Sequence, residues 1–229
     1  FLQVVAMRSV PLALGAVILR LAGISLALSA PGWIALALPL GLGIVGATSF
    51  VSLAVSARVS VGVELAVLAG LLFVRRPATF ELLPVAERKS PFTHALAVVL
   101  AAVGTASGLA FLANVRRFPH GVWDAWAFWN TKARAFALGG DGWSWVFSQL
   151  VVWWHPEYPV LVPATVARGW VLVGSESPLV PIVIAATFTG SSIVLVFWAL
   201  RRRMGPVLRP LRPRCLLNRF DKVNRGDQR

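Results

Sequence analysis

Long runs of uncharged residues constrain this chain more than any other feature. Ala95 to Ala113 is 19 residues without an Asp, Glu, Lys or Arg, and Pro178 to Leu200 is 23 such residues. A helix needs about 20 apolar residues to cross the roughly 30 Å hydrocarbon core of a bilayer. Only 14% of the 229 residues are charged, against about 25% in soluble domains. The sequence therefore indicates an integral membrane protein.

The first part of the chain is predicted to supply further helices. No charged residue occurs between Arg20 and Arg58, and Pro31-Gly32 interrupts this run. A Pro-Gly pair favours a turn between two helices. We therefore expect one span over residues 9–30 and a second over residues 33–57.

Two shorter apolar segments complete the expected architecture. Val59 to Val74 contains Glu64, and we expect it to span with Glu64 near an interface. Tyr158 to Val173 has 16 residues and contains Arg168, so at about 1.5 Å per residue it reaches only ~24 Å. We expect it to lie along the membrane surface, with Arg168 meeting headgroups or a lipid phosphate. The expected fold class is all-α, a polytopic integral membrane helical bundle of about five spans with juxtamembrane helices in one outer loop.

Basic residues set the expected orientation. The net charge is +13, and residues 201–229 hold ten Lys or Arg against two Asp. Because cytoplasmic flanks of membrane helices favour Lys and Arg, residues 75–93 and 201–229 are predicted inside and residues 114–177 outside. This predicts a bacterial inner membrane protein with a periplasmic loop. No basic stripe alternates with aromatic residues, so membrane lipids and not nucleic acids are the expected partners.

Three regions follow from this pattern. Residues 1–93 form the first helices and a cytoplasmic loop, residues 94–204 hold two spans and the outer loop, and residues 205–229 form a basic tail without an apolar face. The tail is expected to be disordered or to contact headgroups. Since the chain begins at Phe1 and not at Met, we expect a fragment of a longer protein.

The outer loop is unusually rich in tryptophan. Seven of the ten tryptophans lie between Trp123 and Trp154. Trp123, Trp126 and Trp129 are spaced as on one helical face, which predicts an amphipathic helix from Asp124 to Leu138. Such tryptophans are also typical of a helix at the level of the headgroups. That simpler interpretation does not explain a carboxylate at position 124, where poor solvation raises the pKa of an acid.

These residues resemble a known family. The segment Gly121-Val-Trp-Asp-Ala-Trp-Ala-Phe-Trp-Asn-Thr-Lys-Ala-Arg134, followed by His155-Pro-Glu-Tyr-Pro-Val-Leu-Val-Pro163, is similar to the first outer loop of GT-C class membrane glycosyltransferases. That class includes the aminoarabinose and protein mannosyl transferases. The likeness covers residues 95–204, and members of the family carry further spans beyond this region. It implies that Asp124 corresponds to the acidic residue of the family's loop and that Tyr158 precedes a juxtamembrane helix.

The resemblance implies transfer of a sugar from a polyprenyl-phosphate donor to an acceptor on the outer face. Asp124 is the expected general base. The side chains expected to contact the lipid phosphate or the substrate come from both motif segments and from the preceding span: Arg116, Arg117, Lys132, Arg134, His155, Glu157 and Tyr158. Among them Arg134 is favoured, since it lies about three helical turns after Asp124 on a similar face, whereas Lys132 would point partly away.

No cofactor is assigned, and no metal ligands are predicted. Many relatives place two acids side by side, whereas Asp124 is flanked by Trp123 and Ala125, so a divalent metal remains only an alternative. The single Cys215 excludes a Cys-based zinc site.

Simpler interpretations accompany these roles. Asp124 is also a favoured helix N-cap, cations near a membrane extend to the headgroups, and the His155 to Pro159 segment can fix the start of the next helix. The alternative function is a non-catalytic membrane protein, either truncated or a scaffold whose basic tail binds lipid. A transporter or channel is less favoured, because the two clearest spans carry only scattered Ser, Thr and Gly.

Overall fold

The structure is a computed structural model that describes residues 2–24, 30–53, 55, 60–74, 91–150 and 155–203. Within these ranges the chain forms helices and connecting turns and no strand, so the all-α prediction is confirmed for them. The elements in chain order are α1 (Leu2–Leu21), α2 (Ala30–Ser52), α3 (Ser60–Phe73), α4 (Pro91–Arg117), the π-helical turn η2 (Ala125–Trp129), α5 (Asn130–Leu138), the 3₁₀ helix η3 (Gly140–Phe147), α6 (Leu161–Val173) and α7 (Leu179–Arg203).

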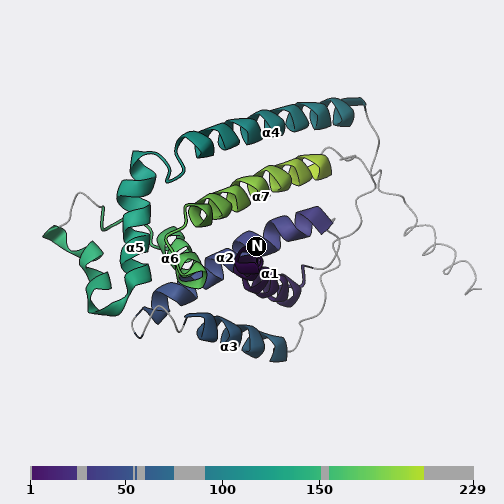
Figure 1. Ribbon diagram of the computed structural model, residues 1–229. Coiled ribbons are helices and arrows are strands. Elements are labelled where there is room, and N and C mark those ends of the chain that lie inside the picture. Colours follow the sequence, from purple (N-terminus) through teal and green to yellow (C-terminus); the bar gives the residue numbers. More distant parts are fainter. Residues whose placement is uncertain are drawn as a thin grey trace, which may run out of the picture.

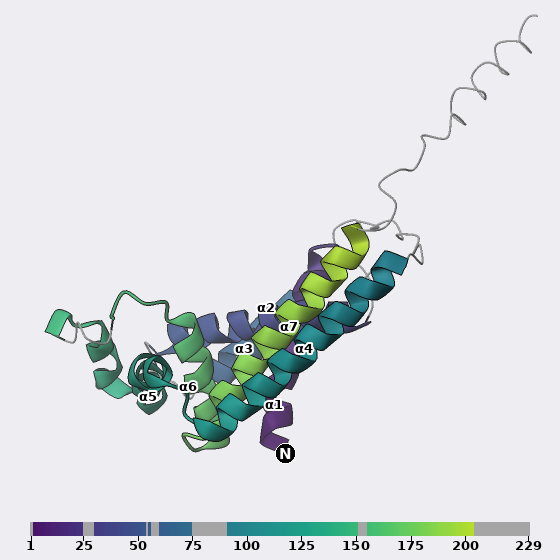
Figure 2. The same cartoon turned by 90° about the horizontal axis from the view of Figure 1, so that it is seen from above.

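Among the described residues, three helices are long and apolar enough to cross a membrane. They are Ala30–Ser52, His94–Arg117 and Leu179–Leu200, and they correspond to α2, α4 and α7. Figures 1 and 2 show α4 and α7 side by side along most of their length. These helices are those of an integral membrane protein, and they include both spans with the clearest sequence pattern.

The expected total of five spans is not confirmed. Helix α3 has 14 residues and reaches only ~21 Å at 1.5 Å per residue, which is less than the hydrocarbon thickness. Helix α1 contains Arg8 and Arg20 and is not among the three helices that meet the length and hydropathy requirements.

The break between the first two helices differs from the prediction. Helix α1 ends at Leu21 and is followed by Gly23, which has a φ of 71°. Pro31 and Gly32 lie in the first turn of α2. Proline is tolerated there because the first N–H groups of a helix have no intrahelical acceptor. The predicted turn at Pro31-Gly32 was therefore wrong, and the left-handed backbone of Gly23 marks the end of α1.

Helices α1 and α2 pack closely through glycines. A methyl group at Gly15 would lie 1.8 Å from the carbonyl oxygen of Ala37, and one at Gly41 would lie 1.7 Å from the carbonyl oxygen of Pro11. Small residues at helix interfaces let backbones approach in this way in membrane proteins. The backbones of α1 and α2 therefore touch where the two helices cross.

The short elements of the 114–177 segment gather at one end of the bundle. Figure 1 shows α5 and α6 at the end where α4 finishes and α7 begins. Helix α6 has 13 residues, about 20 Å, and is too short to cross a bilayer by itself. It contacts α2, α5 and α7, so it joins the loop helices to the apolar bundle.

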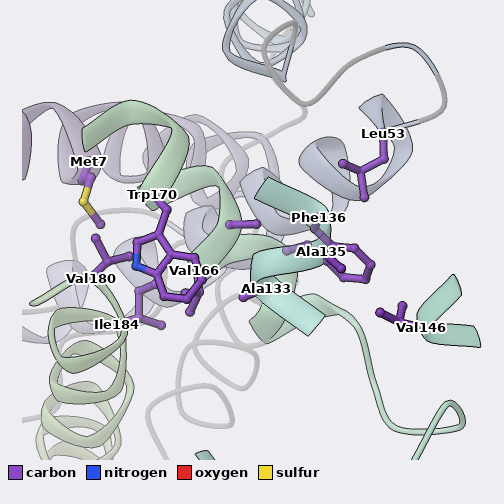
Figure 3. Close-up of a cluster of buried hydrophobic side chains, with 12 residues drawn as sticks. Met7, Leu53, Ala133, Ala135, Phe136, Val146, Val166, Trp170, Val180 and Ile184 are labelled. Carbon is purple, nitrogen blue, oxygen red and sulfur yellow. The ribbon is translucent and has the colours of Figure 1, made fainter. Parts of the chain in front are cut away.

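An apolar core fixes the loop helices on the bundle. Trp170 of α6 and Val180 and Ile184 of α7 lie close together in Figure 3, with Phe136 of α5 further along the same cluster. Phe136 is fully buried and lies 5.6 Å from the ring of Phe50 at the end of α2. The loop is therefore folded onto the ends of α2 and α7.

Some predicted features fall outside the described residues. Of the predicted cytoplasmic segment 75–93, residues 75–90 lie outside them and residues 91–93 begin α4, and the basic tail at residues 205–229 lies outside them entirely. The predicted boundary between residues 93 and 94 lies within the first turn of α4.

The glycine contact gives a matched test on one helix. We expect Gly41→Ala to lower the free energy of unfolding by about 1–3 kcal/mol, because its methyl group collides with the backbone of α1. Gly43→Ala is the control, since its methyl group would lie 4.0 Å from the nearest side chain. Thermal unfolding of both variants in the same detergent measures the difference, and equal transition temperatures would contradict the close packing.

Candidate functional site

The site begins with a tight connection after α4. Gly121 has a φ of 80°, and a methyl group there would lie 2.3 Å from the Cβ atom of Ala125. The buried side chain of Asn130 donates a hydrogen bond from Nδ2 to the carbonyl oxygen of His120 at 3.1 Å. The turn between α4 and the helix formed by η2 and α5, the loop helix, therefore needs glycine at position 121. The side chain of Asn130 holds this turn from inside.

The loop helix contains a π turn that changes its register. The N–H of Asn130 donates to the carbonyl oxygen of Ala125, five residues back, and the hydroxyl of Thr131 donates to the carbonyl oxygen of Trp126 at 3.0 Å. A π turn holds one more residue than an α turn and is frequent at functional sites. It rotates the following residues relative to the predicted continuous α-helix from Asp124 to Leu138.

Asp124 lies at the start of this π turn and is exposed. Its backbone is helical, with φ −61° and ψ −36°, and its side chain makes no cap hydrogen bond. The alternative role of Asp124 as an N-cap was therefore wrong. The prediction of a poorly solvated carboxylate is also not met within the protein, because the surrounding side chains leave Asp124 accessible.

Lys132 joins the two motif segments. Its side chain is only 1% exposed, and Nζ donates to the carbonyl oxygen of His155 and, at 3.5 Å, to that of Tyr158. The ammonium also lies 5.7 Å from the centre of the Tyr158 ring, within reach of a cation–π interaction. Burial lowers the pKa of Lys132, and the nearby Glu157 carboxylate opposes that shift.

Lys132 was predicted to point partly away from the face of Asp124 and Arg134, and in the structure its side chain is directed into the turn at His155. The register change at the π turn brings its side chain to the face that meets the segment after residue 154. Lys132 holds this segment against the loop helix, so its amine is committed to backbone carbonyls.

The residues from His155 to Tyr158 form a compact turn. His155 has a φ of 49°, a conformation that is uncommon for residues other than glycine. Its Nδ1 atom lies 2.9 Å from Oε1 of Glu157, and its ring stacks on Tyr158 with 4.4 Å between centroids. Trp129 stacks near Tyr158 at 5.6 Å. The predicted candidates Lys132, His155, Glu157 and Tyr158 are thus brought together.

The carboxylate of Glu157 is held in its ionised form. A hydrogen bond from its own backbone N–H, followed by the hydrogen bond with His155, lowers the pKa of Glu157. An ionised carboxylate beside Nδ1 favours the imidazole form that carries a proton on this nitrogen. A shallow hollow beside Glu157 is lined by Phe147, Gln149 and Pro156.

Arg134 does not face the turn. Its Nε donates to Glu176 Oε2 at 2.7 Å, and the two side chains are 51% and 43% exposed. Arg116 and Arg117 are exposed at the end of α4, where the guanidinium of Arg117 lies 5.2 Å from the ring of Phe118. Glu176 was not singled out in the sequence, although it is the acidic residue that directly precedes the last span.

The predicted environment of Arg168 was wrong, because its partner is Glu64. Both side chains are buried, with 4% and 0% of their surface exposed, and they form an ion pair between α6 and α3. Nη2 of Arg168 lies 2.5 Å from Oε2 of Glu64, and Nε contacts Oε1. Arg168 therefore meets a carboxylate inside the protein and not a headgroup, because leaving either charge buried alone is costly.

Within the described ranges, no group of three or more His, Cys, Asp and Glu side chains could hold a metal ion. Comparison with protein-family models, curated proteins and solved structures found no match for the chain.

We expect the buried ion pair to show strong coupling between its partners. Glu64→Ala leaves the Arg168 guanidinium buried without a carboxylate, which should cost about 3–5 kcal/mol of unfolding free energy. The double variant Glu64→Leu/Arg168→Leu removes both charges and should lose clearly less than that single variant. Thermal unfolding of the unaltered protein and of both variants measures this. A double variant that loses as much unfolding free energy as Glu64→Ala, or more, would contradict the buried pair.

Lys132 and Arg134 provide a second matched comparison. Lys132→Met removes a charged donor from the carbonyl groups of His155 and Tyr158 and should cost about 1.5–3 kcal/mol, although the N–H of Tyr158 still donates to the carbonyl oxygen of His155. Arg134→Met removes a half-exposed ion pair and should cost less than about 1 kcal/mol. Hydrogen exchange of the amides of residues 155–160 should rise only in Lys132→Met. A similar rise in Arg134→Met would argue against the specific link between Lys132 and this turn.

Proposed function

We propose that this protein is a membrane glycosyltransferase, or part of one, that transfers a sugar from a polyprenyl-phosphate donor to an acceptor on the outer face. The observation that carries the proposal is the contact of the Lys132 amine with the carbonyl groups of His155 and Tyr158. It unites the two segments on which the resemblance to GT-C enzymes rests, next to the end of an apolar helix.

Asp124 has the properties of a proton acceptor in this reaction. Its carboxylate is exposed and not used as a helix cap, so an acceptor hydroxyl or amine can reach it. As the acceptor atom bonds to the anomeric carbon, Asp124 takes its proton, and the lipid phosphate leaves with the electron pair of the broken C–O bond. Asp124 is therefore the general base of the proposal.

The cations divide into two roles. Arg116 and Arg117 are exposed at the end of α4, and guanidinium groups suit the oxygens of a lipid phosphate. Lys132 acts indirectly, because its amine holds the turn at His155. Arg134 would contact phosphate only after release from Glu176.

The exposed aromatic residues support a location at the membrane surface. Trp123 and Trp126 are 62% and 47% exposed, and their rings lie 4.8 Å apart. Tryptophan is enriched at the level of the headgroups. We therefore propose that the 114–177 segment rests on the outer, periplasmic face of a bacterial inner membrane, in contact with lipid.

A non-catalytic scaffold is the second candidate. It is favoured by the engagement of two predicted phosphate ligands, Lys132 and Arg134, in contacts inside the protein. A scaffold that holds other proteins or lipids needs these contacts but does not need a free carboxylate at Asp124.

We expect Asp124→Asn to lower sugar transfer by about 10²–10⁴-fold, because the amide cannot accept the proton. The assay uses membranes containing the protein and radiolabelled polyprenyl-phosphate sugars. Ser144→Ala is the control, since it changes an exposed polar side chain of the same segment without touching the base or the proposed phosphate ligands. Transfer that survives Asp124→Asn would exclude Asp124 from the chemistry, and no transfer by the unaltered protein would favour the scaffold.

A further inference from the structure

The pair formed by His155 and Glu157 differs from the other ion pairs of the protein. Nδ1 of His155 and Oε1 of Glu157 are 2.9 Å apart, and the side chains are 39% and 65% exposed. The pair joins residues of a single turn, whereas the pairs of Arg168 and Arg134 join separate elements. It therefore contributes little to holding the helices together.

His155 is nonetheless held on several sides. Its left-handed backbone is anchored by the Lys132 amine on its carbonyl oxygen, and its ring stacks on Tyr158. The ring of Phe128 stands perpendicular to it, with 5.1 Å between centroids. In the described part of the chain, no hydrogen-bond partner reaches the other ring nitrogen, Nε2. A strained backbone around an oriented and partly exposed imidazole is typical of a functional position.

We propose that His155, oriented by Glu157, protonates the lipid phosphate as it leaves. This inference rests on the proposed function and adds an acid to the base Asp124. The bond between the anomeric carbon and the phosphate oxygen breaks, its electron pair stays on that oxygen, and the Nε2 proton of the imidazolium moves to it. Glu157 stays ionised and keeps the proton on Nδ1, so it is a positioning residue.

The two groups can exchange a proton. As the C–O bond breaks, negative charge develops on the phosphate oxygen, and an imidazolium N–H beside it can serve as a general acid. A protonated imidazole paired with a carboxylate also offers its remaining N–H to an anion without adding net charge.

The first test measures phosphate contact without requiring turnover. The full chain in lipid nanodiscs is treated with diethyl pyrocarbonate, and modification of each histidine is followed by mass spectrometry. Undecaprenyl phosphate at ten times its dissociation constant should slow modification of His155 about tenfold, since only the free fraction reacts. His94 and His120 are exposed and serve as internal controls. Equal protection by undecaprenol, or protection by inorganic phosphate but not by the lipid, overturns the proposal.

The second test measures the proton transfer. His155→Gln should lower kcat by about 10²–10⁴-fold while leaving KM for the acceptor unchanged. Glu157→Gln retains an acceptor for Nδ1 but loses the charge, so kcat should fall less and the ¹⁵N shifts of His155 should report an altered tautomer. Normal turnover by His155→Gln overturns the proposal.

The two proposals fail in different ways. If the unaltered protein transfers sugar and His155→Gln does so equally well, the inference fails and the proposed function stands. If Asp124→Asn loses transfer but retains protection of His155, both are supported. If no sugar is transferred while undecaprenyl phosphate still protects His155, the proposed function and the proton transfer fail, and the phosphate site remains.

Discussion

The ion pair between Arg168 and Glu64 is the interaction on which the arrangement of the short helices depends. Both side chains are almost completely buried. Burying one alone would leave an uncompensated charge, which is far more costly than burying the pair. Neither α3 nor α6 is long enough to cross a bilayer by itself, and the pair brings them together beside α2. The loop helices then pack on α6 through the apolar cluster that contains Phe136 and Trp170, so the ion pair and this cluster together determine where the candidate site lies.

The same requirement explains the second buried cation. Among the described residues no carboxylate contacts Lys132 directly, and its amine is met by backbone carbonyls of the turn at His155. Backbone carbonyl oxygens are suitable partners because each has two lone pairs, and the oxygen of His155 accepts from both the Lys132 amine and the N–H of Tyr158. Because a buried ammonium needs acceptors, it favours the conformation of the turn in which these carbonyl groups contact Nζ. Positioning of His155 and burial of Lys132 are two aspects of one contact.

Sequence patterns predicted the long helices better than the contacts among the short ones. The uncharged run Ala95–Ala113 falls within α4, and all of the run Pro178–Leu200 except Pro178 falls within α7, because length and apolar composition act locally along a helix. The environment of Arg168 could not be predicted in this way, since its partner is 104 residues away. The contact of Lys132 with the turn at His155 was not predicted for another reason. A π turn depends on hydrogen bonds five residues apart, and no simple spacing rule signals where it begins.

The ionisable residues that support or form the candidate site fall into two groups, one buried and one accessible. Glu64, Lys132 and Arg168 are buried, and their charged groups contact partners inside the protein. Their charges therefore affect how the elements pack. Asp124 and His155 are accessible, and each retains a polar atom that the protein does not use. Because a folded chain pairs its buried polar groups, the groups that remain available at the surface of a well-packed loop are those that can act on another molecule. In the proposed function, Asp124 and His155 are therefore favoured as base and acid, beside the exposed Arg116 and Arg117 that suit a phosphate.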